Sequence, residues 1–167
     1  MQASWWHGRR DNPHMIDEPH ITQSETQMIA FIHVTVPREE IRFVMDPALR
    51  ELKGALAGQG IKPIGPWFTH HLRIDPKVFD FQVCLPVSKE VVATGRVQAG
   101  RMFETKVART IYRGPYEGLG NAWREFGKWI EAHGFRPGED LWECYLAGPE
   151  KSNNPAEWET ELSRAIE

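Results

Sequence analysis

Apolar and polar residues alternate over residues 140–148, DLWECYLAG, and this period of two predicts a half-buried β-strand. Leu141, Glu143 and Tyr145 point to one face of that strand, and Trp142 and its alternate neighbours point to the other. The Trp142 face is the better core face, so the carboxylate of Glu143 stands between two bulky side chains on the opposite face. Such a carboxylate is costly unless it is paired, protonated or placed to meet a cation.

The same patterns predict helices from Pro37 to Gly58 and from about Leu119 to Gly134, and further strands over residues 21–36, 64–72, 78–87, 102–113 and 158–166. Pro47 lies inside the apolar stripe of the first helix and should kink or split it. Residues 88–100 are expected to form a loop.

The predicted elements follow the order strand, helix, strand, strand, and then repeat it. The residues support the repeat, because Gly60-Ile61-Lys62-Pro63 recurs as Gly134-Phe135-Arg136-Pro137, an offset of 74 residues (60 to 134). The predicted fold class is α+β: two tandem βαββ modules related by a pseudo-twofold axis, with an antiparallel sheet that carries two helices on one face and a ligand cleft on the other. The predicted boundaries are an N-terminal tail over 1–19 and a single domain over 20–167, with modules at about 20–87 and 101–167 and a linker at 88–100.

The first 19 residues have no hydrophobic period and contain two prolines, so we expect a tail. The protein could start at Met1 or at Met15. Trp5 and Trp6 favour docking of this tail on the domain.

The repeat gives Glu143 a set of neighbours. The 74-residue offset relates Glu143 to Thr69 and Tyr145 to His71, and it places Trp67 on the same face. If both helices cover the opposite face, these five side chains meet near the pseudo-twofold axis as an aromatic-lined cleft with one carboxylate. Such a cleft suits a flat, hydrophobic and often cationic small molecule. The alternative is that Glu143 is a solvated strand residue and Tyr145 an ordinary cross-strand contact.

Composition narrows the function. The formal net charge is −3 and the sequence pI about 6.2, so there is no basic field for nucleic acid. No apolar run approaches the roughly 20 residues of a membrane span, and no secretory signal is visible. Cys84 and Cys144 fit no zinc or redox spacing, which predicts reduced thiols in a cytoplasmic protein.

Three other groups of residues are candidates for metal or cofactor chemistry. His70 and His71 are adjacent on a strand, so they point to opposite faces and do not form a metal pair. Trp123, Phe126 and Trp129 have the helical spacing of a core stripe. His133 at a helix end does not suit an axial haem ligand, so we expect no metal and no cofactor.

Four segments carry a resemblance to a known family: GPYEGL at 114–119, WECY at 142–145, FDFQVCLPV at 79–87 and WETEL at 158–162. In order and spacing they resemble the GyrI-like small-molecule-binding domain, the effector-binding domain of AraC- and MerR-type multidrug regulators, over about residues 20–166. The resemblance implies the two-module fold. It also implies that Glu143 is the buried glutamate that pairs with cationic ligands, with aromatic lining from Trp67, Tyr112 and Tyr145.

The chain departs from the family pattern in two places. Multidrug regulators attach this domain to a helix-turn-helix domain, and about 20 leading residues are too few for one, so we expect no direct nucleic-acid binding. Family members often have an acidic residue where this chain has Gln82. Glu143 is then the main carboxylate candidate, although Asp80 is close in sequence.

We therefore expect a stand-alone binding protein that senses or sequesters hydrophobic or cationic aromatic compounds. The predicted ligand-binding residues are Glu143, Tyr145, Trp67, His71, Tyr112 and Thr69. The enzyme question stays open, with binding favoured. The alternative is a hydrolase of strained cyclopropane-containing toxins, with Glu143 as general acid or base and Tyr145 or His71 as hydrogen-bond donor.

A third hypothesis is a protector that interacts with DNA gyrase, for which the sequence offers no partner-facing motif. The identity of the ligand and the formation of a homodimer are left open by the sequence.

Overall fold

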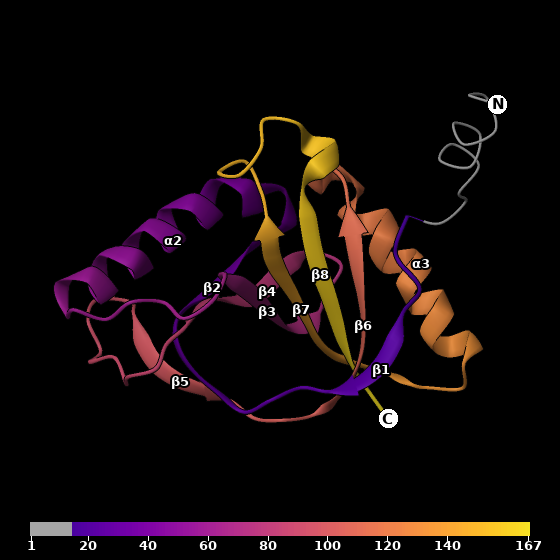
Figure 1. The fold of residues 1–167 in the computed structure, drawn as a ribbon, viewed down its shortest axis with the longest axis horizontal. Helices are drawn as coiled ribbons and strands as arrows, with labels where there is room; N and C mark the ends of the chain where they lie inside the picture. Colours follow the sequence, from indigo (N-terminus) through magenta and orange to yellow (C-terminus); the bar gives the residue numbers. More distant parts are fainter. Residues whose placement is uncertain (1–14) are drawn as a thin grey trace.

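Eight strands form one antiparallel sheet in the computed structural model, which describes residues 15–167 (Figure 1). Their spatial order is β1-β6-β8-β7-β3-β4-β2-β5. Their bounds are β1 His20–Gln23, β2 Gln27–Pro37, β3 Phe68–Ile74, β4 Val78–Pro86, β5 Gln98–Met102, β6 Lys106–Arg113, β7 Pro137–Ala147 and β8 Glu159–Ile166.

Two α-helices cover one face of this sheet. They are α2, Ile41–Gly58, and α3, Leu119–Ala132, and each follows a single 3-10 turn, η1 Arg38–Glu40 or η2 Tyr116–Gly118. A third such turn, η3 Pro155–Glu157, precedes β8. Each helix buries one apolar stripe, with Ala48, Leu52 and Leu56 on α2 and Ala122, Phe126 and Ile130 on α3.

The predicted α+β fold class is confirmed, and the strand–helix–strand–strand order is present twice as β2-α2-β3-β4 and β6-α3-β7-β8. The register of the two central strands gives the position of the pseudo-twofold axis. Thr69 of β3 lies directly opposite Glu143 of β7, its counterpart in the repeat. The residue pair before it and the residue pair after it are counterparts of each other under the same 74-residue offset. Glu143 therefore stands on the axis that relates the two modules.

The repeated glycine ends both helices in the same way. Gly60 has φ +69° and Gly134 has φ +82°, the left-handed conformation that glycine adopts without strain. In each case the next amide turns back to the last helical turn, where the N–H of Ile61 donates to Leu56 O at 2.9 Å and that of Phe135 donates to Ile130 O at 3.2 Å.

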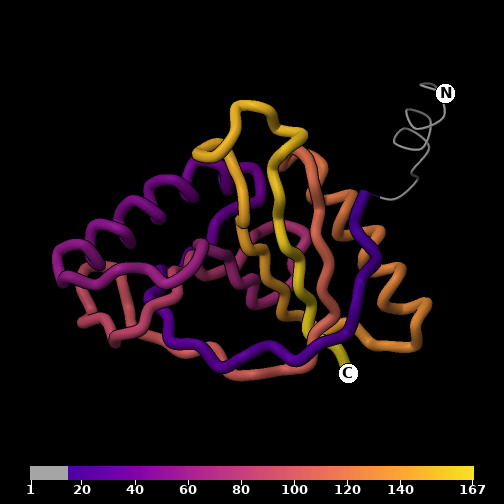
Figure 2. The backbone as a smooth tube through the Cα atoms, viewed as in Figure 1, coloured from indigo at the N-terminus to yellow at the C-terminus, as the bar shows by residue number. Residues whose placement is uncertain are grey.

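The modules also exchange their leading strands. β1 precedes β2 in the chain but pairs with β6, and β5 precedes β6 but pairs with β2. The connecting segments 24–26 and 103–105, here called the straps, run side by side across the sheet (Figure 2). They are tied together, because the N–H of Ser24 donates to Thr105 O at 2.8 Å and the N–H of Thr105 donates to Ser24 Oγ at 3.0 Å.

Several element boundaries differ from the predictions. Residues 98–102, expected as loop and the start of one long strand, form β5, whose sequence QAGRM has no clear alternation. Pro47 does not split α2, which is continuous from 41 to 58. The carbonyl that Pro47 leaves without its helical donor belongs to Phe43, which is 65% exposed, so water can replace that bond. The strand expected over 64–72 begins at Phe68.

The expected tail is folded at its end. Ile16 is buried and forms an isolated bridge with Tyr112, and the N–H of Asp17 donates to Ile111 O at 3.0 Å. Residues 15–19 therefore belong to the edge of the sheet, whereas Trp5 and Trp6 lie outside the described residues. Within residues 15–167, neither helix combines the length and the apolar character that crossing a bilayer requires.

Candidate functional site

The side of the sheet on which Glu143 lies was predicted wrongly. Glu143 lies opposite Thr69 on β3 and opposite Leu162 on β8, and Leu162 packs in the same core cluster as Phe126 of α3. Glu143 is thus on the helix-covered face. The prediction failed because Trp142 and Cys144 are apolar and were expected to face the helices. They pack instead in a different apolar cluster, on the side of the sheet that the straps cross.

Two neutral donors hold the Glu143 carboxylate. The indole Nε1 of Trp123, on α3, donates to Oε2 at 2.6 Å, and the hydroxyl of Tyr145 donates to Oε1 at 2.7 Å. Because the single Tyr145 proton goes to Glu143, the hydroxyl of buried Thr69 donates to Tyr145 Oη across their 3.0 Å separation. Glu143 is half-buried. Between residues 15 and 167, no lysine, arginine or histidine forms an ion pair with it.

Aromatic rings surround this carboxylate. Trp67 stacks on Tyr145, with ring centroids 4.2 Å apart and planes inclined by 28°. Tyr116, from the turn before α3, meets Tyr145 edge-on at 6.0 Å and packs against Trp158 at 4.9 Å. Rings in stacked and edge-on contact fix one another's orientation, and their negative faces favour a cation.

The environment keeps both tyrosines of the cluster protonated. Burial raises the pKa of Tyr145 well above its ordinary value, and the negative charge of Glu143 raises it further. Burial also raises the pKa of Tyr116, with added contributions from Glu150, Glu143 and Asp46. At neutral pH Tyr145 is therefore a hydrogen-bond donor and not a base.

His71 is a neutral ring at this site. Burial lowers its pKa, and the charge of nearby Glu143 opposes that effect without cancelling it. The imidazole stacks on Phe81 with centroids 5.2 Å apart and meets Phe79 edge-on at 5.6 Å. His71 thus contributes a polar ring to the edge of the cluster but no positive charge.

Five of the six predicted ligand-binding residues come together on this face: Glu143, Tyr145, Thr69, Trp67 and His71. Tyr112 does not join them. It is 3% exposed in the core beneath α3, and its hydroxyl donates to Pro115 O at 2.7 Å. The two glycines of GPYEGL make room for it, since a Cβ at Gly114 would lie 2.7 Å from the Tyr112 hydroxyl and one at Gly118 would overlap it. Tyr112 therefore anchors the turn before α3.

Trp123 and Tyr116 belong to the site although the sequence reasoning placed neither there. Trp123 follows the apolar stripe of α3, which concealed its role, but it lies at the edge of that stripe and is only half-buried. The available signal was the indole N–H, which needs an acceptor when it is partly buried. Tyr116 lies in GPYEGL, one of the four segments that carry the family resemblance.

The remaining acidic and histidine candidates are on the opposite face. Asp80 is held by His33 at 2.6 Å and by Arg73 at 2.9 Å, and Gln82 lies opposite His70 in the sheet. His70 and His71 point to opposite faces, as predicted. In residues 15–167, no three histidine, cysteine or acidic side chains gather in a way that could hold a metal ion.

A family model, the GyrI-like small molecule binding domain, matches residues 17–166 of this chain. The chain belongs to the GyrI-like family. The resemblance inferred from four short segments is thereby confirmed over almost the entire chain, and with it the assignment as a small-molecule-binding domain.

Solved structures share this fold. EcmrR in the EcmrR–DNA complex superposes with a TM-score of 0.81 at 18% identity over 99% of this chain and 63% of the EcmrR chain, so this chain spans less than two thirds of that protein. The EcmrR C-terminal domain gives 0.80 at 21% identity, covering 90% of this chain and 97% of that domain. SAV2435 bound to tetraphenylphosphonium gives 0.65 at 11% identity, covering 90% and 94%. No curated protein matches this GyrI-like chain.

Proposed function

We propose that this GyrI-like domain binds hydrophobic organic cations on the helix-covered face, with Glu143 as the counter-charge, and that it serves in drug sensing or sequestration. One observation carries the proposal. A half-buried carboxylate stands on the pseudo-twofold axis, is held only by neutral donors, and has no cationic partner among residues 15–167. A partly desolvated carboxylate without a counter-charge gains most from a ligand that brings one.

The aromatic rings determine the class of cation. Trp67, Tyr145 and Tyr116 offer π-faces and edges around the carboxylate, which favours a delocalised or lipophilic cation over a strongly hydrated one. The Trp123 indole and the incoming cation would compete for the same carboxylate oxygen, so binding should be accompanied by a change in the Trp123 environment. A ligand of this class, tetraphenylphosphonium, occupies SAV2435, which shares the fold.

The test is calorimetric titration with tetraphenylphosphonium. Replacing Glu143 by Gln keeps the shape and removes the charge, and we expect affinity to fall roughly 10- to 100-fold, as for a lost charge-assisted contact. Glu139→Gln is the matched control, because Glu139 is an exposed glutamate on the same strand. Equal affinity of Glu143→Gln and the unaltered chain would show that the carboxylate is not the counter-charge.

The hydrolase alternative uses the same atoms. Glu143 would orient a water molecule, and Tyr145, held protonated by burial, would donate to the developing oxyanion. Incubation with a cyclopropane-containing electrophile, followed by mass spectrometry, separates the two functions. Catalysis gives a product that has gained one water and accumulates beyond one equivalent, whereas binding leaves the compound unchanged.

A further inference from the structure

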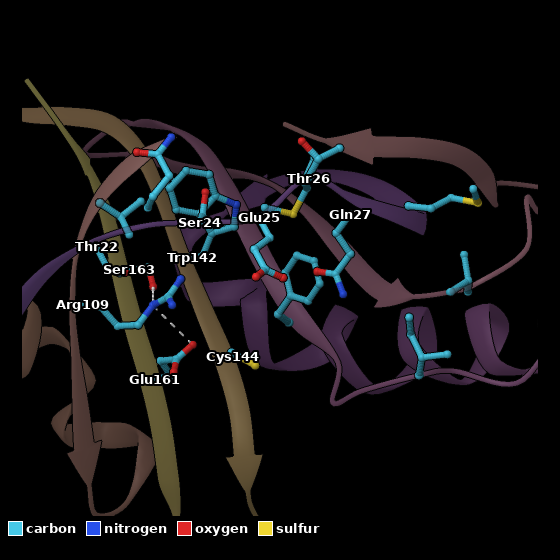
Figure 3. A pocket seen from close by; sticks show the side chains of 17 residues that line it. Thr22, Ser24, Glu25, Thr26, Gln27, Arg109, Trp142, Cys144, Glu161 and Ser163 are labelled. Atoms are coloured by element: carbon cyan, nitrogen blue, oxygen red, sulfur yellow. Dashed lines mark hydrogen bonds and ion pairs between the residues drawn. The ribbon is translucent and has the colours of Figure 1, made fainter. Parts of the chain in front are cut away.

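The face of the sheet that the straps cross, opposite the helices, contains a cavity of about 640 Å³ beneath the strap 24–26 (Figure 3). This volume is in the range of roughly 300–1,000 Å³ that small-molecule sites occupy. A second cavity of about 520 Å³ lies on the side of the other strap, and Trp142 and Met102 line both. Neither Trp142 nor Met102 belongs to the proposed cation site, because both lie on the face of the sheet that the straps cross.

Arg109, on β6, brings a positive charge to the first cavity. Its Nε donates to Ser163 Oγ at 2.9 Å and lies 3.7 Å from Glu161 Oε1, whereas no residue of the described chain hydrogen-bonds its two terminal amino groups. Figure 3 shows these three side chains together at one side of the cavity. A guanidinium with a free pair of amino groups is suited to a planar carboxylate.

Trp142 supplies a second unused donor. Its indole Nε1 is buried and has no hydrogen-bond partner, one of two such side-chain atoms among residues 15–167. The ring itself is fixed, because it stacks on His70 with centroids 4.8 Å apart and planes inclined by 15°. Buried indole N–H groups usually find an acceptor, so this N–H is suited to meet an acceptor atom of a ligand.

The sheet register sets the backbone separation of the two residues that supply these donors. Arg109 of β6 lies opposite Ser163 of β8, and Ser163 lies opposite Trp142 of β7. Two strand spacings separate Arg109 from Trp142, which is roughly 10 Å. Between and beside them the lining includes Phe68 and the adaptable side chains of Met28 and Met102.

We propose that this cavity is a second binding site, for flat aromatic carboxylates. The carboxylate accepts hydrogen bonds from the terminal amino groups of Arg109, and the ring system extends toward Trp142, where an acceptor atom meets the indole N–H. Two acidic residues also line the cavity. Glu161 lies 3.7 Å from Arg109 Nε and Glu25 is exposed on the strap, and neither forms a hydrogen bond with the terminal amino groups of Arg109. The two faces of one sheet then take ligands of opposite charge.

Titration with 2-naphthoate and with its neutral analogue 2-naphthamide tests the site. We expect saturable binding of 2-naphthoate, at least a tenfold loss of its affinity in Arg109→Gln, and no change for the amide. Arg101→Gln is the matched control, since Arg101 is an exposed arginine that lines the second cavity. Absence of saturable 2-naphthoate binding to the unaltered chain, or equal affinity in Arg109→Gln, would overturn the proposal.

A second variant keeps the test decisive if Arg109→Gln does not fold. Trp142→Phe keeps an aromatic ring and removes the N–H, and it identifies the Trp142 indole signal in the proton–nitrogen NMR spectrum. Addition of 2-naphthoate should shift that signal, and Trp142→Phe should bind it several-fold more weakly. A stationary indole signal at saturation would also refute the site. Glu143→Gln should bind 2-naphthoate normally, so this proposal and the cation proposal can fail separately.

Discussion

Neighbouring residues of β7 enter two different environments. Glu143 and Tyr145 lie on the helix-covered face, where hydrogen bonds from Trp123 and Thr69 complete a polar cluster within aromatic rings. Trp142, which directly precedes Glu143 in the sequence, lies on the opposite face, in a small apolar cluster that the straps cross. Both faces of the central strands are therefore at least partly covered. In such a sheet, apolar character does not identify the face that carries the helices.

The faces also differ in which charged group has unused binding capacity. On the helix side, the carboxylate of Glu143 has no cationic partner among residues 15–167, and on the strap side, the terminal amino groups of Arg109 make no hydrogen bond to a described residue although its Nε pairs with Glu161. On our two proposals, the first face binds a cation and the second an anion. The predictions below separate the two faces, from the largest expected effect to the smallest.

Truncating one tryptophan on each face should give opposite results. Trp142→Ala removes the ring that stacks on His70 and should reduce the free energy of unfolding by about 3 kcal/mol, with tetraphenylphosphonium affinity nearly unchanged. Trp67→Ala removes the ring that stacks on Tyr145 and should weaken that affinity. Urea unfolding and calorimetry of both variants provide the measurement. A loss of cation affinity in Trp142→Ala alone would place the cation on the wrong face for this account.

Removing the Tyr145 hydroxyl should have an intermediate effect. Tyr145→Phe leaves buried Thr69 without its acceptor and Glu143 without one donor, which should destabilise the fold by about 1–3 kcal/mol. Tyr116→Phe is the control, because that hydroxyl makes no hydrogen bond to a described residue. Equal stabilities of the two variants in urea unfolding would contradict the hydrogen-bond chain.

The two faces should respond to acid in different pH ranges. The pKa of His71 is below 6.5 in the folded protein, so the unfolded chain binds more protons and stability falls as the pH drops below about 6.5. Hydrogen bonds from His33 and then Arg73 lower the pKa of Asp80 to about 2, so its contribution is lost only as the pH falls from about 4 toward 2.

Unfolding free energies measured across pH provide the check. His71→Phe should flatten the profile near pH 6, and Asp80→Asn should flatten it only below pH 4. A His71→Phe profile that is as steep near pH 6 as that of the unaltered chain would contradict the burial of a neutral imidazole.

The smallest effect concerns the thiols of the strap side. Burial raises the pKa of Cys144 to about 12 and also raises the pKa of Cys84, so almost no thiolate exists at pH 8. Labelling of the folded protein by iodoacetamide should be slow for both residues and should become fast in denaturant. Fast labelling of Cys144 without denaturant would mean that the straps open readily.

Much of the fold could be predicted, because the repeat is encoded by local signals. The Gly60 and Gly134 motifs each end a helix, and the offset that they define places Thr69 opposite Glu143. The exchanged strands β1 and β5 were not predicted as they occur, because they are short edge strands whose pairing depends on contacts distant in sequence.

The site was predicted in part for a related reason. The five residues that the repeat brought together do meet, but their face depends on where the helices pack, which is a tertiary property. Trp123 was missed because a helical apolar stripe conceals a side chain that also has a polar atom. Tyr112 lies apart from these five residues, in the core beneath α3, and its residue type suits a core anchor as well as it suits a ligand site.

The most direct test of the central claim locates the cation itself. Tetraphenylarsonium has the shape and charge of tetraphenylphosphonium, and its arsenic gives an anomalous signal in a crystal of the complex. The account predicts one strong arsenic peak on the helix-covered face beside the Glu143 carboxylate, with the Trp123 indole displaced from its present position. A peak beneath the straps near Trp142, with none beside Glu143, would contradict it.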